Sequence, residues 1–206
     1  MNATRILARI RAMSEAEVLA VVPPRIIRDI KREDPRPLFK AFVIGQEGVA
    51  EPHAVGIGKT IMRWFSSAIK ALFMKLDLST KVFNGHEETN EHAGRTPVGE
   101  VIGKDLQTIN GFLSAVAVTY IYPQFKDFPF DVASIEATVE MPGDEREFDV
   151  EEADVVEVTG IALGDSRVDT PAFPGATLQA ALQAFADKAT PHKEKITMNQ
   201  IGRAHV

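Results

Sequence analysis

The sequence predicts an α+β protein whose core is a mostly antiparallel β-barrel flanked by helices. Several strand-like runs follow one another between residues 81 and 163, with few helices between them. The run over residues 132–141 alternates between apolar and polar side chains, as a strand with one buried face does. A succession of strands of this kind favours a barrel-like sheet.

Composition sets the limits within which a function can be sought. The chain has 206 residues, of which 45% are apolar and 25% charged, and a chain of this length buries roughly 70% of its unfolded surface in one core. The absence of cysteine excludes disulfides, thiolate metal sites and a cysteine nucleophile. The net charge of −6 argues against a nucleic-acid partner. No apolar run reaches the roughly 18 residues of a membrane span, so no membrane partner is expected.

The chain divides into an arm, one main domain and a tail. We expect a helical N-terminal arm over residues 1–36, a β-barrel domain over residues 37–190 and the start of a truncated C-terminal extension over residues 191–200. Basic helices such as those of the arm are typical of a solvated surface segment, with docking to a partner as the alternative. Residues 201–206, IGRAHV, match one reading frame of a common sequencing adapter, so we expect a non-native tail after Gln200.

Local patterns predict the main elements within these regions. Ser14 and Glu17 form a capping-box pattern at the start of a helix, and Pro23-Pro24 ends that helix. Apolar residues at three- and four-residue spacing predict a helix over residues 60–76. Asn110-Gly111 predicts a turn, and strands are expected over residues 38–43, 112–122, 132–141 and 155–163. A last helix is expected over residues 177–188.

Three polar residues lie in or next to apolar strands, where a buried polar group needs a hydrogen-bond partner. His86 follows a short apolar strand and opens a polar loop, Ser134 lies in an alternating strand, and Glu157 lies among valines. A serine becomes a nucleophile when an adjacent base takes its proton and a third group orients that base. His86 as base, Ser134 as nucleophile and Glu157 as orienting group satisfy all three residues. The open alternatives are a surface position for Ser134 and a neighbouring cation for Glu157.

Three blocks of sequence follow one another between roughly residues 80 and 178. They are Asn84-Gly85-His86-Glu87 with Gly94-Arg95 and Val98-Gly99-Glu100-Val101, then Val132-Ala133-Ser134-Ile135, then Val156-Glu157-Val158-Thr159-Gly160-Ile161 with Pro171-Ala172. In this order the blocks resemble the prohead (capsid maturation) proteases of tailed phages. The first block resembles the stretch around the histidine of that family, the second its nucleophile strand, and the third its glutamate strand with the following proline loop.

The resemblance implies a herpesvirus-assemblin-like fold, a β-barrel flanked by helices. It also implies a serine endopeptidase that cleaves internal scaffold and capsid protein, and often itself, inside the prohead within the host bacterial cytoplasm. Carried over, Ser134 is the nucleophile, His86 the general base and Glu157 the third member, and no cofactor is implied. Related assemblins act as dimers, so a homodimer is one option for this chain. Glu136 departs from the family pattern, because many members have glycine there.

Two other functions stay open on the sequence. His86 and His92, with the carboxylates between them, offer ligands for a metal-dependent hydrolase, although their spacing differs from the one-turn spacing that aligns two ligands on a helix. Alternatively, the chain is a non-enzymatic phage scaffold or structural protein that keeps the barrel without the activity. A run at residues 55–60, VGIGKT, has His53 where a phosphate-binding loop needs glycine, so we expect no nucleotide there.

Overall fold

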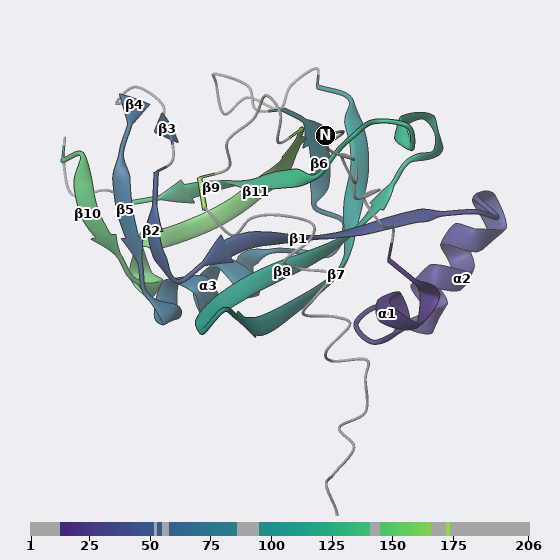
Figure 1. The fold of residues 1–206 in the computed structure, drawn as a ribbon, viewed down its shortest axis with the longest axis horizontal. Coiled ribbons are helices and arrows are strands. Elements are labelled where there is room, and N and C mark those ends of the chain that lie inside the picture. The colour runs from purple at the N-terminus through teal and green to yellow at the C-terminus, as the bar shows by residue number, and fades with distance from the viewer. Residues whose placement is uncertain are drawn as a thin grey trace, which may run out of the picture.

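A computed structural model of the chain describes residues 13–51, 53–54, 58–85, 95–140, 145–165 and 172–173. A six-stranded sheet in the order β1-β8-β7-β6-β11-β9 forms the centre, beside a three-stranded sheet, β10-β5-β2, and a two-stranded one, β3-β4 (Figure 1). The strands of the central sheet are β1 (Leu38–Gln46), β6 (Lys81–Asn84), β7 (Pro97–Ile109), β8 (Phe112–Ile121), β9 (Val132–Val139) and β11 (Val155–Gly164). The smaller sheets contain β2 (Gly48–Ala50), β3 (His53–Ala54), β4 (Gly58–Lys59), β5 (Ile61–Trp64) and β10 (Glu147–Val150).

The central sheet is curled and mixed. Its pairings are antiparallel except for β6 with β11, which run parallel. The edge strands β1 and β9 come close to each other without forming a ladder, so the sheet makes a half-barrel. The predicted α+β class is confirmed. The expectation of a mostly antiparallel barrel holds only in part. The strand β6 lies between β7 and β11 and runs antiparallel to β7 but parallel to β11.

The longest ladder, between β7 and β8, is closed by the predicted turn. Ile109 pairs with Phe112, which leaves Asn110 and Gly111 as a two-residue loop. Both loop residues have positive φ, at 54° and 86°. Asparagine and glycine tolerate this conformation, and its twist matches that of a hairpin. The turn expected from the sequence is therefore confirmed.

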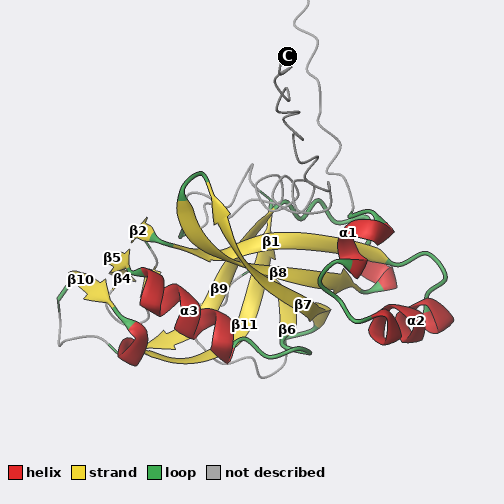
Figure 2. Ribbon diagram, turned by 90° about the horizontal axis from the view of Figure 1, so that it is seen from below, coloured by secondary structure: helices red, strands yellow, loops and turns green. Residues whose placement is uncertain are grey.

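Helix α3 (Ser66–Lys75) covers the inner face of the half-barrel. It buries Ala68, Ile69 and Leu72 against the central sheet, together with Trp64 of β5 and other apolar side chains. Figure 2 shows α3 lying across the strands, with α1 and α2 grouped towards the other end of the molecule. One continuous core thus joins the helix, the small sheet and the inner face of the large sheet.

The prediction of one helix over residues 60–76 is wrong in its first turn. Residues Ile61–Trp64 form β5, whose side chains alternate between exposed and buried, and the helix begins only after Phe65. The same apolar residues fit a helical and an alternating pattern over so short a stretch. Residues 61–64 form a strand because they pair with β2 on one side and with β10 on the other. These two pairings give the backbone N–H and C=O groups of the three strands hydrogen-bond partners.

The outer face of β1, β7 and β8 is covered by α1 (Glu15–Leu19) and α2 (Pro24–Glu33). Val18, Val22 and Ile27 are buried there against Phe39 and Tyr120. The expectation of a solvated arm is therefore wrong for the apolar side of these helices, although their arginines stay at the surface. None of the helices in the described ranges is long and apolar enough to span a membrane.

Several expected features lie outside the described residues. They are the helix over 177–188, the extension over 191–200 and the adapter-like tail over 201–206. Short 3-10 turns complete the described elements, at Pro123–Phe125 and Glu152–Asp154.

Candidate active site

Ser134 lies on the outer face of the half-barrel, near the start of β9. Its neighbours Ala133 and Ile135 face the inner core, so the serine side chain projects to the other side. Ser134 pairs with Ala162 of β11, and Ala162 in turn pairs with Phe83 of β6. A row across three strands therefore has a partly buried serine at one end, a small residue in the middle and an aromatic ring at the other end.

His86 lies outside the described residues, but the residue before it does not. Gly85 follows β6, and its amide donates a 2.8 Å hydrogen bond to the carbonyl oxygen of Leu163. Leu163 is next to Ala162, the partner of Ser134. Gly85 and Ser134 therefore flank the same end of β11, one on each side of it.

Glu157 is placed towards the opposite end of β11. It pairs with Thr138, and the Thr138 hydroxyl donates a 3.2 Å hydrogen bond to its carboxylate. Thr138 is four residues along β9 from Ser134, or about 13 Å of strand. The side chain is also exposed, so the premise that a buried Glu157 needs a histidine partner does not hold. Among the described residues, the structure places Ser134 and Glu157 on one face but does not bring them into contact.

A buried ion pair that the sequence did not predict lies beside Ser134. The guanidinium of Arg95 donates to both carboxylate oxygens of Glu136, at 3.0 and 3.2 Å. The side chains of Arg95 and Glu136 are only 7% and 9% exposed. Arg95 also donates to the carbonyl oxygen of Gly85 and lies 4.2 Å from the ring centroid of Phe83. Glu136 is on the same face of β9 as Ser134, two residues along.

Gly160 leaves the space that this ion pair occupies. A Cβ atom added at Gly160 would lie 2.7 Å from Oε2 of Glu136 and 3.1 Å from Cε2 of Phe83. The glycine therefore lets the Glu136 carboxylate lie directly over the backbone of β11. Glu136, which departs from the pattern of the resembling family, has a partner and a prepared place. The sequence does not predict this ion pair, because Arg95 and Glu136 are far apart along the chain and only the strand order brings them together.

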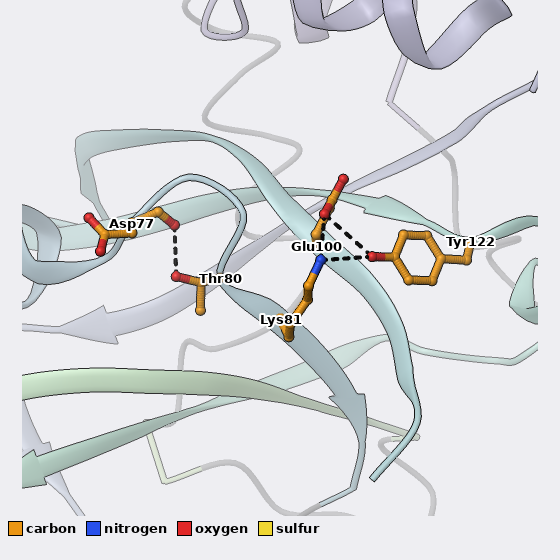
Figure 3. A network of polar contacts seen from close by, with 5 residues as sticks. All are labelled: Asp77, Thr80, Lys81, Glu100 and Tyr122. Carbon is orange, nitrogen blue, oxygen red and sulfur yellow. Dashed lines mark hydrogen bonds and ion pairs between the residues drawn. The ribbon is translucent and has the colours of Figure 1, made fainter. Parts of the chain in front are cut away.

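A second polar network lies on the outer side of β6 and β7 (Figure 3). The ammonium of Lys81 donates to Glu100 at 2.8 Å and to the Tyr122 hydroxyl at 3.2 Å. The hydrogen bond to Glu100 raises the pKa of Lys81 above its ordinary value. Lys81 is 45% exposed, so this pair contributes little to stability. We interpret it as a surface link between β6, β7 and the end of β8.

No metal centre marks the site within the described ranges. Those residues contain no group of three or more histidine, aspartate or glutamate side chains that could hold a metal ion. His86 and His92, the predicted alternative ligands, lie outside them. A surface hollow is lined by five residues of α2, namely Arg25, Arg28, Asp29, Arg32 and Glu33.

Comparison with known proteins gives no relative of this chain. No family model matches it, and neither a curated protein nor a solved structure matches it.

Proposed function

We propose that the chain is a serine endopeptidase of capsid maturation, with Ser134 as nucleophile and His86 as general base. Its substrates would be phage scaffold protein, the major capsid protein and the chain itself, and its place the prohead interior in the host bacterial cytoplasm. In this proposal the curled sheet with its flanking helices corresponds to the assemblin-like barrel. Glu157 is included as the third member that the resemblance implies.

One observation carries the proposal. Ser134 and Gly85, which directly precedes His86, flank the same end of β11, and the residue between them on the outer face is only an alanine, Ala162. Two strand spacings, or about 10 Å, separate β6 from β9. On the outer face no large side chain of β11 stands in this gap, which supports His86 as the partner of Ser134 in the proposal.

The chemistry follows from the two residue types. His86 takes the proton of the Ser134 hydroxyl as Oγ attacks the carbonyl carbon of the scissile peptide bond. The resulting tetrahedral oxyanion collapses, the C–N bond breaks and His86 returns the proton to the leaving amine. Water then hydrolyses the acyl-enzyme with the same base. Since Glu157 is bonded to Thr138 away from the serine, its share in the reaction is the smallest of the three.

A fluorophosphonate probe, which reacts with activated serines, tests the assignment. We expect the full chain to be labelled at one serine, Ser134→Ala to abolish labelling, and His86→Gln to lower its rate by about a hundredfold or more. Ser66→Ala, at the first turn of α3, is the matched control and should label like the wild type. A wild-type chain that is not labelled, or a labelled Ser134→Ala variant, contradicts the proposal.

A second candidate is a phage scaffold or structural protein without activity. The exposed position of Glu157 and its hydrogen bond to Thr138 favour it, because a triad would need this carboxylate next to the base. In that case Ser134→Ala leaves particle assembly unchanged, and neither chain reacts with the probe. Labelling of the wild type excludes this candidate.

A further inference from the structure

We infer that the two ends of the molecule bind each other between copies, so that the chain associates with itself head to tail. One end carries an arginine face, which consists of Arg25, Arg28 and Arg32 on α2. The other end carries an acidic edge, which consists of β10 and the residues on either side of it, with exposed carboxylates at Glu145, Glu147, Asp149, Glu151 and Glu152. The inference is independent of the proposed peptidase activity, because that activity uses none of these residues.

The arginine face is the exposed side of a helix whose apolar side is docked. Arg25, Arg28 and Arg32 follow one another at spacings of three and four residues, so they lie on one side of α2 over about 10 Å. The side chains of Arg25 and Arg32 are 86% and 76% exposed, and both contact the carboxylate of Asp29. The Arg28 guanidinium has no ion-pair partner in the part of the chain that the structure describes. Since Asp29 and Glu33 are the only carboxylates of α2, the helix has an excess of positive charge.

The acidic edge is the free end of the three-stranded sheet. Among the described strands, β10 pairs with β5 and with no other, so one of its backbone edges faces outward. Glu147 and Asp149 project to the exposed side, because the residues that alternate with them are buried. Residues 145–157 contain seven carboxylates and a single arginine. Arg63 of β5 contacts Glu147 and Asp149, but it neutralises only a small part of this charge.

The two surfaces lie at opposite ends of the molecule. Figure 1, drawn with the longest axis horizontal, places β10 at one end and α2 at the other, and Figure 2 shows the same arrangement after a quarter turn. The central sheet lies between them, so the arginine face cannot contact the acidic edge of its own copy. It is complementary in charge to the acidic edge of a second copy, and we assign that edge as its occupant.

Like charge disfavours the symmetric alternatives. In a two-fold dimer each surface would meet its own equivalent, so that arginines would face arginines, or the carboxylates of Glu147 and Asp149 would face the same carboxylates. A contact between unlike ends avoids both repulsions. It also leaves one free surface of each kind at the ends of every assembly, so further copies add without a fixed limit. Ion pairs between exposed side chains are weak and screened by salt, so association requires low ionic strength and a high protein concentration.

Sedimentation velocity of the full chain at several protein concentrations, in about 20 mM and about 500 mM NaCl, tests the inference. At low salt we expect the average sedimentation coefficient of the wild type to rise with concentration beyond the value of a dimer. At high salt it should stay at the monomer value. Arg28→Glu should weaken association by about tenfold or more at low salt. Lys75→Glu makes the same change of charge at an exposed position of α3, and as the matched control it should stay within about twofold of the wild type.

A pair of charge-reversed variants gives the sharpest test. The variant Arg28→Glu/Arg32→Glu is acidic at both ends, and the variant Glu147→Lys/Glu152→Lys is basic at both ends. Each should remain monomeric alone at low salt, whereas their equimolar mixture should associate, which also shows that both variants are folded. The inference is overturned by a wild type that stays monomeric or stops at a dimer, and equally by a mixture that does not associate. A monomeric wild type whose α2 arginines retain a short DNA duplex would assign the face to nucleic acid and overturn it as well.

Discussion

The ammonium group of Lys40 donates a 2.7 Å hydrogen bond to the carbonyl oxygen of Phe130, and so links β1 to the segment that leads into β9. Lys40 is only 4% exposed and lies 5.7 Å from the centroid of the Phe130 ring. Burial lowers the pKa of Lys40 to about 8, although the nearby Asp131 opposes this shift. The two free edges of the half-barrel are therefore joined by a charge that is costly to bury.

This burial predicts a pH dependence of stability. Lysine ordinarily titrates at 10.5, so between about pH 8 and 10.5 the unfolded chain binds more protons than the folded one. The free energy of unfolding therefore rises with pH in this window and falls as the pH drops through about 8. Urea denaturation at pH 7 and 10 should show that wild type gains about 2 kcal/mol relative to Lys40→Met. The same substitution at the exposed Lys70 is the control, and a constant difference between wild type and Lys40→Met would refute the prediction.

Asp34 predicts a second pH dependence of stability, at acid pH. Its carboxylate follows α2, is 6% exposed and accepts from Lys126, the Arg36 amide and the Tyr120 hydroxyl. Burial alone would raise the pKa of Asp34, but these hydrogen bonds together hold it below its ordinary value of 3.8. The stability it contributes is therefore present above about pH 4 and is lost as the pH falls through the lower folded pKa.

Asp34→Asn should accordingly cost about 1–3 kcal/mol at pH 7 and clearly less at pH 2.5. Thermal unfolding monitored by circular dichroism at both values measures this. Asp29→Asn, in an exposed ion pair of α2, should have little effect at either pH. An equal loss of stability for Asp34→Asn at pH 7 and pH 2.5 would contradict the assignment.

Two glycines of the central sheet should differ sharply in their tolerance of alanine. A Cβ atom at Gly99 would lie 2.4 Å from the carbonyl oxygen of Tyr120, which is backbone of the neighbouring strand. At Gly45 it would meet only the side chains of Ile69 and Leu72, both at 3.4 Å. We expect Gly99→Ala to lose about 3 kcal/mol or more and Gly45→Ala less than about 1.5 kcal/mol in urea denaturation. Similar losses at both positions would show that β8 can move away from β7.

The Arg95–Glu136 pair also predicts a strong interaction free energy in a double-mutant cycle. Arg95→Met alone leaves a carboxylate buried without its main partner and should cost about 3–5 kcal/mol. The double variant with Glu136→Gln should recover a large part of this loss. The parallel cycle with Lys81→Met and Glu100→Gln should give less than about 1 kcal/mol, because that pair is exposed. Equal interaction energies in the two cycles would contradict the assigned burial.

Local patterns were predicted well because short-range chemistry determines them. The Ser14–Glu17 capping box is formed as the sequence indicated, with reciprocal hydrogen bonds between the two residues. The Asn110-Gly111 turn and the alternation along β9 depend on φ preferences and on one buried face, which can both be read from consecutive residues.

The features that were missed depend on strand order. β5 was assigned to a helix because one of its two partners, β10, lies far away in the sequence and the other, β2, is only three residues long. Arg95 and Glu136 meet only because β6 enters beside β11, an arrangement that no local pattern encodes. Glu157 was expected to be buried because valines surround it in the sequence. In the structure its side chain is exposed near the start of β11, which only the position of that strand in the sheet determines.

The parallel pairing of β6 with β11 also sets the order in which the protein can assemble on the ribosome. β7 and β8 close over two residues and can form as soon as they emerge, but Val82 must wait for Ile161 until all the intervening strands have been synthesised. Contacts of such long sequence separation slow folding. Until β11 emerges, nothing holds the strand of Ser134 beside the end of β6. A nascent chain is thereby kept, until β11 has emerged, from any chemistry that needs both of these parts of the chain.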